Sequence, residues 1–131
     1  MNIEDILTTA KTIAVVGISP KQSRESFGVA AYLQKAGYRI VPVRPTEEEI
    51  LGEKVFNSLE DIPFPVDIVD VFRKPEAVPP IAREAVRIGA KVLWLQEGVG
   101  SPEGEDIARE GGLEVVSNRC ILKEHRRLKH K

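Results

Sequence analysis

Cysteine and histidine are scarce in this sequence. Among 131 residues there is one cysteine, Cys120, and there are two histidines, His125 and His130. A single cysteine excludes a disulfide within the chain, and His125 has no His, Cys or Asp neighbour at metal-ligand spacing. We therefore expect no bound metal. We interpret Cys120, at the end of a predicted strand, as a buried structural thiol.

Long apolar runs and an excess of charge of either sign are also absent. No run approaches the length of a membrane span, and the first residues carry acids where a signal peptide carries bases. The 19 Lys and Arg residues balance 20 Asp and Glu residues, although the tail from Lys123 to Lys131 is basic. The sequence therefore predicts a soluble, cytoplasmic protein with neither a membrane nor a nucleic acid as its partner.

Residues 13–28, IAVVGISPKQSRESFG, have the pattern of a strand, a tight turn and the start of a helix. The first four residues are an unbroken apolar run, typical of a strand buried on both faces of a parallel sheet. Gly17 follows directly, and a helical pattern begins near Arg24 and ends at Gly37. Such a turn aims backbone N–H groups and a helix N-terminus at a phosphate.

Polar side chains in the same loop suit a phosphate ligand. Ser19 and Ser26 can donate hydroxyl hydrogen bonds, and Lys21 and Arg24 supply positive charge. The loop is not a complete dinucleotide fingerprint, because Ser19 stands where G-x-G-x-x-G has its second glycine. The alternative is a tight turn at Gly17 followed by solvated polar residues.

The rest of the chain alternates between short strand and helix patterns. Apolar runs bounded by turn residues predict strands over 38–43, 66–72, 91–95 and 113–116. Apolar spacing predicts helices over 2–9, 79–88 and 102–110, residues 54–56 suit a very short strand, and the polar run 46–49 suits a solvated face or a helical turn. This order predicts one domain over 1–131: an α/β, doubly wound Rossmann-like fold with a mainly parallel five-stranded sheet and helices on both faces.

In such sheets a ligand binds outside the carboxyl ends of the strands. The predicted strand-end loops are 17–26, 43–46, 72–75, 95–100 and 117–120. Basic side chains outnumber acidic ones there, and they stand among hydrogen-bonding groups: Ser19, Lys21, Arg24, Arg44, Arg73, Lys74, Gln96, Asn118 and Arg119. A cationic edge on a near-neutral protein predicts an anionic ligand.

Two acids and a tryptophan fall on predicted strands. Asp67 and Asp70 are not a catalytic pair, because residues three apart on a strand face opposite sides of the sheet. We expect one of them to cap a turn or to pair with an arginine. Trp94, on a central strand, is predicted to lie in the core or in a pocket wall.

Several runs resemble the small CoA-binding domain proteins, which are similar to the N-terminal domain of the succinyl-CoA synthetase alpha subunit. The matching runs, from about Thr12 to Leu128, are VVGIS, VPVRP, LGEKVFNSLEDIP, PVDIVDVFR, GAKVLWLQEGV and the NRC segment with its downstream EHRRL. The resemblance implies a CoA nucleotide over 17–19, with its phosphates near Lys21 and Arg24 and its adenine near 43–45 and 72–73. Together with the strand-end groups, it gives these candidate CoA-binding residues: Gly17, Ile18, Ser19, Lys21, Arg24, Ser26, Val43, Arg44, Pro45, Phe72, Arg73, Gln96 and Gly98.

Arg44 separates two classes of nucleotide. An NAD site needs an acid at the end of the second strand to hold the ribose 2′-hydroxyl, whereas Arg44 suits a phosphate on the ribose, as in CoA or NADP. Relatives commonly carry Asn-Pro with a cation after it, whereas here the arginine precedes Pro45.

We therefore hypothesise a stand-alone CoA or acyl-CoA binding protein without catalysis of its own. The synthetase alpha subunit has a second domain with a phosphorylated histidine, which these 131 residues lack. No nucleophile and base stand at a readable spacing either. Two alternatives stay open: an NADP- or NAD-binding redox enzyme or sensor, and a protein–protein module whose pocket is vestigial.

Overall fold

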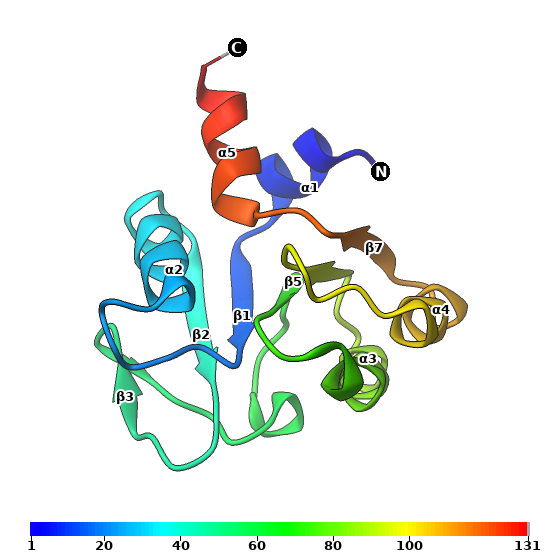
Figure 1. The fold of residues 1–131 in the computed structure, drawn as a ribbon, viewed down its shortest axis with the longest axis horizontal. Helices are drawn as coiled ribbons and strands as arrows, with labels where there is room; N and C mark the ends of the chain where they lie inside the picture. The colour runs from blue at the N-terminus through cyan, green and yellow to red at the C-terminus, as the bar shows by residue number, and fades with distance from the viewer. Residues whose placement is uncertain (131) are drawn as a thin grey trace.

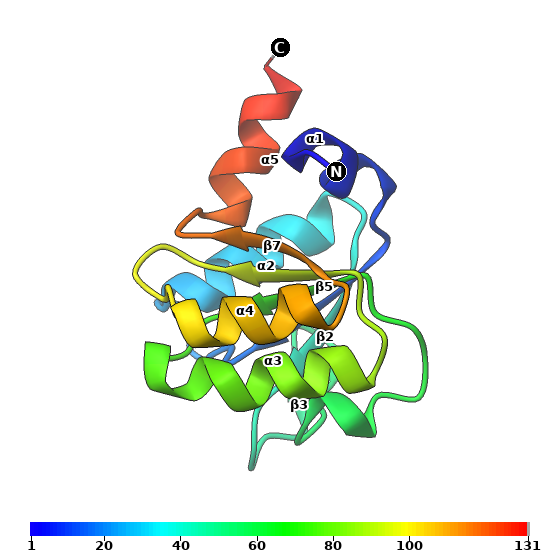
Figure 2. The ribbon, with the colours of Figure 1, turned by 90° about the vertical axis from the view of Figure 1, so that its right-hand side faces the viewer.

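A five-stranded parallel sheet forms the centre of the structure, a computed structural model that describes residues 1–130 (Figures 1 and 2). Across the sheet the strands are β2 (Arg39–Val43), β1 (Thr12–Val16), β5 (Ile68–Val71), β6 (Val92–Leu95) and β7 (Glu114–Ser117). Every neighbouring pair is parallel. The predicted fold class and all five predicted strands of the sheet are confirmed, with ends that shift by one or two residues.

Helices cover both faces of this sheet, as predicted. The helices α1 (Ile3–Thr9), α2 (Glu25–Lys35) and α5 (Ile121–Lys129) lie on one face, and α3 (Val78–Arg87) and α4 (Pro102–Glu110) lie on the other (Figure 1). Residues of β1 alternate between the two faces: Ile13 and Val15 join one apolar cluster, and Ala14 and Val16 join the other. All four of these side chains are buried, which explains why the strand is apolar without interruption. None of the helices in residues 1–130 is long and apolar enough to cross a bilayer.

Residues 49–54 form a small hairpin, so the helical turn predicted as one alternative for 46–49 is wrong, whereas the other alternative, a solvated face, agrees with the mostly exposed side chains there. The strands β3 (Glu49–Ile50) and β4 (Glu53–Lys54) pair antiparallel. Thr46 has φ 69°, which is incompatible with a right-handed helix, and Leu51 and Gly52 make the turn with φ 56° and 73°. Val43 then bridges to Phe56, so the hairpin is attached to the end of β2. The remaining short elements are η1 (Leu59–Asp61) and η2 (Pro75–Ala77).

The basic tail is a docked helix, α5, which the sequence reasoning did not predict. Ile121 is fully buried, and Leu122 and Leu128 pack against the same apolar cluster. The Nδ1 atom of His125 lies 2.9 Å from the hydroxyl of Tyr32 on α2. Burial and the nearby Lys129 lower the pKa of His125, so the imidazole is neutral in this contact at neutral pH. The helix α5 is amphipathic: its lysines and arginines are exposed, whereas Glu124 is buried and pairs with Arg119 and Arg127.

Asp67 and Asp70 have different environments, and of the two expected roles, a cap or an arginine partner, Asp67 has the first. Asp67 accepts hydrogen bonds from the backbone N–H groups of Lys11 and Thr12 at 2.9 and 3.0 Å, and its carboxylate lies 3.4 Å from the ammonium of Lys91. Asp70 is fully buried between Val15 and Trp94, and within residues 1–130 neither of its carboxyl oxygens has a hydrogen-bond partner. Burial raises the pKa of Asp70 well above its usual range, which favours the protonated form of its carboxyl.

We predict that Asp70→Asn makes the fold more stable than the wild type at neutral pH, and that the difference grows with pH. Because the pKa of Asp70 is raised in the folded state, the folded protein keeps a proton that the unfolded chain releases above about pH 3.9. Between that pH and the folded-state pKa, the free energy of unfolding of the wild type falls by about 1.4 kcal/mol per pH unit. The amide does not titrate. Urea unfolding at pH 4.5, 5.5 and 6.5 measures the difference.

Asp67→Asn is the matched control. The hydrogen bonds from the N–H groups of Lys11 and Thr12 and the ammonium of Lys91 lower the pKa of the Asp67 carboxyl. Asp67→Asn removes the charge that they stabilise, so it is expected to destabilise the fold at pH values above the unfolded-state pKa of the carboxyl. If the free energy of unfolding changes with pH in the same way for Asp70→Asn and the wild type, Asp70 is ionised in the folded protein and the prediction is wrong.

Candidate functional site

Gly17 fixes the start of the loop that leaves β1. Its φ is 85°, a region that favours glycine, and a Cβ atom there would lie 2.6 Å from both the carbonyl oxygen of Phe72 and the Cδ of Arg73. Its N–H donates to the carbonyl of Val43 at 3.0 Å. This one residue therefore holds together the carboxyl ends of β1, β2 and β5.

Two serines fold the loop back onto the N-terminus of α2. The N–H of Ser19 donates to the hydroxyl oxygen of Ser26 at 2.9 Å, and the N–H of Lys21 donates to the hydroxyl oxygen of Ser19 at 3.1 Å. Arg24 occupies the N-cap position of α2 with its side chain exposed and without a capping hydrogen bond. The positive end of the helix dipole therefore faces the same space as Lys21 and Arg24.

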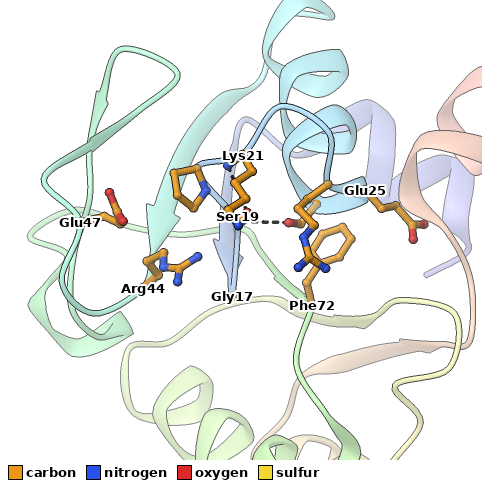
Figure 3. A pocket seen from close by; sticks show the side chains of 10 residues that line it. Gly17, Ser19, Lys21, Glu25, Arg44, Glu47 and Phe72 are labelled. Atoms are coloured by element: carbon orange, nitrogen blue, oxygen red, sulfur yellow. Dashed lines mark hydrogen bonds between the residues drawn. The ribbon is translucent and has the colours of Figure 1, made fainter.

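A first hollow of about 530 Å³ opens at this loop (Figure 3). It brings together most of the loop residues that the sequence predicted, with Arg44 from the end of β2 and Phe72 from the end of β5. Its lining residues are Gly17, Ser19, Pro20, Lys21, Arg24, Glu25, Ser26, Arg44, Glu47 and Phe72. Ile18 is the exception among the loop candidates, because its side chain is fully buried in the core.

Arg44 is held against the loop by a neutral group. Its Nη1 donates to the carbonyl oxygen of Ile18 at 3.1 Å, and its backbone N–H donates to the carbonyl of Phe56 at 3.0 Å. Within residues 1–130 it makes no ion pair with Glu47 or with Glu48. The guanidinium is therefore positioned at the hollow with its charge not matched by a bound carboxylate.

A second hollow, of about 430 Å³, adjoins the first and shares Glu25 and Phe72 with it. Its other lining residues are Arg73, Lys74, Pro75, Gln96, Glu97, Gly98 and Val99. The two hollows together follow the carboxyl ends of β1, β5 and β6. The predicted residues Arg73, Gln96 and Gly98 belong to this second hollow. Val43 and Pro45 line a smaller hollow of about 100 Å³ on the other side of Arg44 and Arg73.

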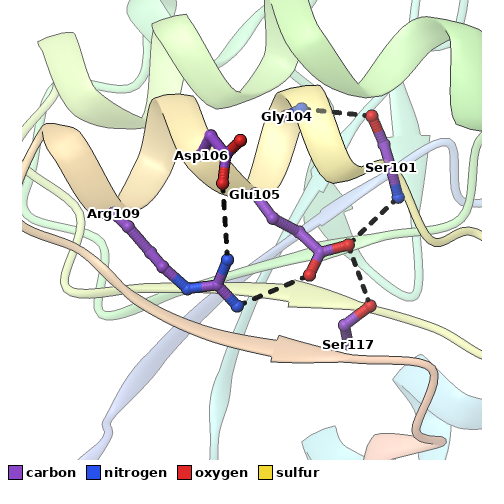
Figure 4. Close-up of polar contacts among 6 residues, drawn as sticks. All are labelled: Ser101, Gly104, Glu105, Asp106, Arg109 and Ser117. Carbon is purple, nitrogen blue, oxygen red and sulfur yellow. Dashed lines mark hydrogen bonds and ion pairs between the residues drawn. The ribbon is translucent and has the colours of Figure 1, made fainter.

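A hydrogen bond to Asn118, the residue after β7, holds the loop that carries Gln96 and Gly98. Gly98 has φ 82°, and its N–H donates to the side-chain oxygen of Asn118 at 3.1 Å. Further along, Glu105 accepts from the N–H of Ser101 and from the hydroxyl of Ser117, both at 3.2 Å (Figure 4). The N-terminus of α4 is thereby attached to the end of β7.

Gln96 is buried, and its side-chain amide is only half satisfied. Its Oε1 accepts from the N–H of Ile121 at 3.2 Å, at the start of α5. Its Nε2 has no hydrogen-bond partner within residues 1–130. A buried donor without a partner is uncommon and indicates a missing acceptor.

Acidic side chains at the two hollows were not among the candidate residues. Glu25 and Glu47 line the first hollow, and Glu25 and Glu97 line the second. Ligand atoms of Glu25, Glu97 and Cys120 lie within 4.8 Å of one another, a grouping that could hold a metal ion, although Lys123 already lies 3.0 Å from Glu97. These residues come from three distant segments, so no spacing in the sequence could have revealed the cluster. Cys120 itself is buried, as predicted.

Comparison with known proteins identifies the family. A family model described as CoA binding domain matches residues 11–126. The chain belongs to the CoA-binding domain family. The uncharacterized protein YneT of Bacillus subtilis is 42% identical over 123 residues, which are 94% of this chain and 91% of YneT. A hypothetical protein from Pyrococcus horikoshii superposes with a TM-score of 0.94 at 42% identity, over 98% of this chain and 93% of that one.

The domain also forms part of larger enzymes. The ADP-forming acetate–CoA ligase II of Archaeoglobus fulgidus is 28% identical over 117 residues, which are 80% of this chain and 17% of the ligase. This CoA-binding domain is thus homologous to the N-terminal portion of such ligases and akin to the CoA-binding domain of the succinyl-CoA synthetase alpha subunit. It spans less than a fifth of the ligase's length.

We predict that Gly17→Ala destabilises the fold by at least about 1–2 kcal/mol, since the left-handed backbone alone costs an alanine about that much and the Phe72 carbonyl must also move. Gly28→Ala is the control, because Gly28 is an exposed position of α2 and nothing lies within 4 Å of the new Cβ. It is expected to gain about 0.5–1 kcal/mol from helix propensity. Chemical denaturation measures both. Equal effects of the two replacements would contradict the account of Gly17.

Proposed function

We propose that this CoA-binding domain is a single-domain module that binds CoA or acyl-CoA along the two hollows, in the cytoplasm and without catalysis of its own. The observation that carries the proposal is Arg44, held beside the Gly17 loop of a CoA-binding domain and not neutralised by Glu47 or Glu48. CoA carries a diphosphate, a 3′-phosphate on its ribose and a long uncharged arm. Each part matches a different stretch of the sheet edge.

The diphosphate is assigned to the Gly17 loop. The exposed side chains of Lys21 and Arg24 supply two positive charges, and the first turn of α2 has backbone N–H groups without partners inside the helix. The N–H of Ser19 donates to the hydroxyl oxygen of Ser26, which holds the loop in shape without a ligand. Such preorganisation lowers the entropy that binding costs.

The ribose phosphate is assigned to Arg44, and the adenine to the residues on either side of it. Val43 and Pro45 lie with Arg73 at the smaller hollow, and Phe72 offers a half-buried ring between the first and second hollows. From there the uncharged arm would run past Phe72 into the second hollow, toward Gln96 and Gly98. The acyl group carried by the arm is left open.

The absence of catalysis is part of the proposal and is supported by where the histidines lie. His125, on α5, contacts Tyr32 and Tyr38, and neither His125 nor His130 lines either hollow. NADP is the competing ligand, because it too has a phosphate on its ribose. The two ligands differ in the position of that phosphate and in what lies beyond the diphosphate.

We predict that Arg44→Ala weakens CoA binding roughly tenfold or more while leaving the affinity for dephospho-CoA, which lacks the 3′-phosphate, nearly unchanged. A charge-assisted contact shielded from water contributes about 1.5–3 kcal/mol, and about 1.4 kcal/mol corresponds to a factor of ten. Titration calorimetry of the wild type and the variant with both ligands, and with NADP, measures the effect.

Arg83→Ala is the matched control, since Arg83 is an exposed arginine on α3 that pairs with Glu103 and lines neither hollow. It should leave both affinities unchanged. If Arg44→Ala weakens both CoA forms equally, Arg44 only shapes the loop. If the wild type binds NADP and not CoA, the proposed function is wrong.

A further inference from the structure

The second hollow ends beside a buried thiol. Cys120 is the N-cap residue of α5 and is 5% exposed. Its Sγ lies within 4.8 Å of carboxylate oxygens of both Glu25 and Glu97, which line that hollow. The thiol therefore lies next to two exposed side chains that line the hollow.

Gln96 supplies an independent sign that this end of the site takes a ligand. The Ile121 N–H fixes the amide oxygen of Gln96, so the amide nitrogen is the group left without a partner, and 97% of the residue's surface is buried. Because Gln96 lines the second hollow and also bonds to the residue after Cys120, the orphan donor and the thiol belong to one corner. An acceptor of the kind found in an amide or a thioester would satisfy it.

We propose that Cys120 is a modification site at which the thiol end of CoA is captured as a mixed disulfide. This inference rests on the proposed function, which brings the arm of CoA along the second hollow. That arm contains amide carbonyls, which suit the Gln96 donor, and it ends in a sulfur, which then meets Cys120. The chemical class of the reactant is a disulfide of CoA.

The step is a thiol–disulfide exchange in which nothing is lost or gained overall. The thiolate of Cys120 attacks one sulfur of the CoA disulfide, a new S–S bond forms to that sulfur, and the old S–S bond breaks. The leaving CoA thiolate takes up the proton that Cys120 gave up. The protein gains the mass of one CoA less two hydrogens, and one CoA thiol is released.

Burial makes this reaction selective. Cys120 is almost wholly buried and lies beside the side chains of Glu25 and Glu97. A thiol so buried is expected to react slowly with free disulfides and rapidly only with one that the site holds in place.

Intact-mass measurement of the reduced protein, incubated in parallel with CoA disulfide and with glutathione disulfide, tests the proposal. The expected result is a single CoA adduct that forms at least tenfold faster than the glutathione adduct, that a reductant reverses, and that Cys120→Ser abolishes. Arg44→Ala should slow the CoA reaction severalfold and leave the glutathione reaction unchanged. Arg83→Ala should change neither.

The failure of this inference and the failure of the proposed function are distinguishable. Cys120→Ser is expected to bind CoA with unchanged affinity in calorimetry. If CoA binds but CoA disulfide gives no adduct, or reacts no faster than glutathione disulfide, Cys120 is a structural thiol and CoA binding stands. If CoA does not bind at all, both proposals are overturned.

Discussion

The approach of the Phe72 carbonyl to Gly17 is the constraint on which the ligand edge depends. Only a residue without a Cβ allows the end of β5 to lie so close to the turn after β1, and the positive φ aims the next residues along the sheet edge. The Gly17 N–H then binds the end of β2. Three strand ends are fixed relative to one another at this point, and the hollows on either side of Phe72 follow from it.

The net charge at this edge of the sheet depends on whether its basic side chains pair with carboxylates or with neutral acceptors. Several other surface arginines are paired with acids, as Arg87 is with Glu60 at 2.6 Å. Arg44 instead donates to a backbone carbonyl, which orients the guanidinium without cancelling its charge. Glu25 and Glu47 moderate the positive potential of the first hollow, and this favours a ligand whose phosphates lie at separate cations over a dense polyanion.

The fold could be predicted from the sequence because its signals are local. An apolar run such as Ile13–Val16 can only be a buried strand in so short a segment, and glycine and proline mark the ends of the helices. α4 was predicted to the residue, from Pro102 to Glu110. The candidate residues that share the first hollow could be placed together because parallel strands end at the same edge.

The features that sequence reasoning missed depend on tertiary contacts. The apolar residues of α5 are few among its charges, so the helix is recognisable only once Ile121 packs into the core. The hairpin at 49–54 depends on left-handed residues, Thr46 and Leu51, which are not glycine. Within residues 1–130, the carboxyl of Asp70 and the Nε2 of Gln96 lack partners because of how distant segments pack around them. The cluster of Glu25, Glu97 and Cys120 likewise joins residues up to 95 positions apart.

The central claim is that CoA lies along the two hollows at the carboxyl edge of the sheet. A titration of the ¹⁵N-labelled protein with CoA, followed through its backbone amide NMR signals, tests that claim most directly. We predict saturable shifts in the amides of Gly17, Ser19, Arg44 and Gly98, while those of Thr9 and Ala10, beneath the opposite edge of the sheet, stay in place. Shifts confined to that opposite edge, or no shifts at all, would contradict the account.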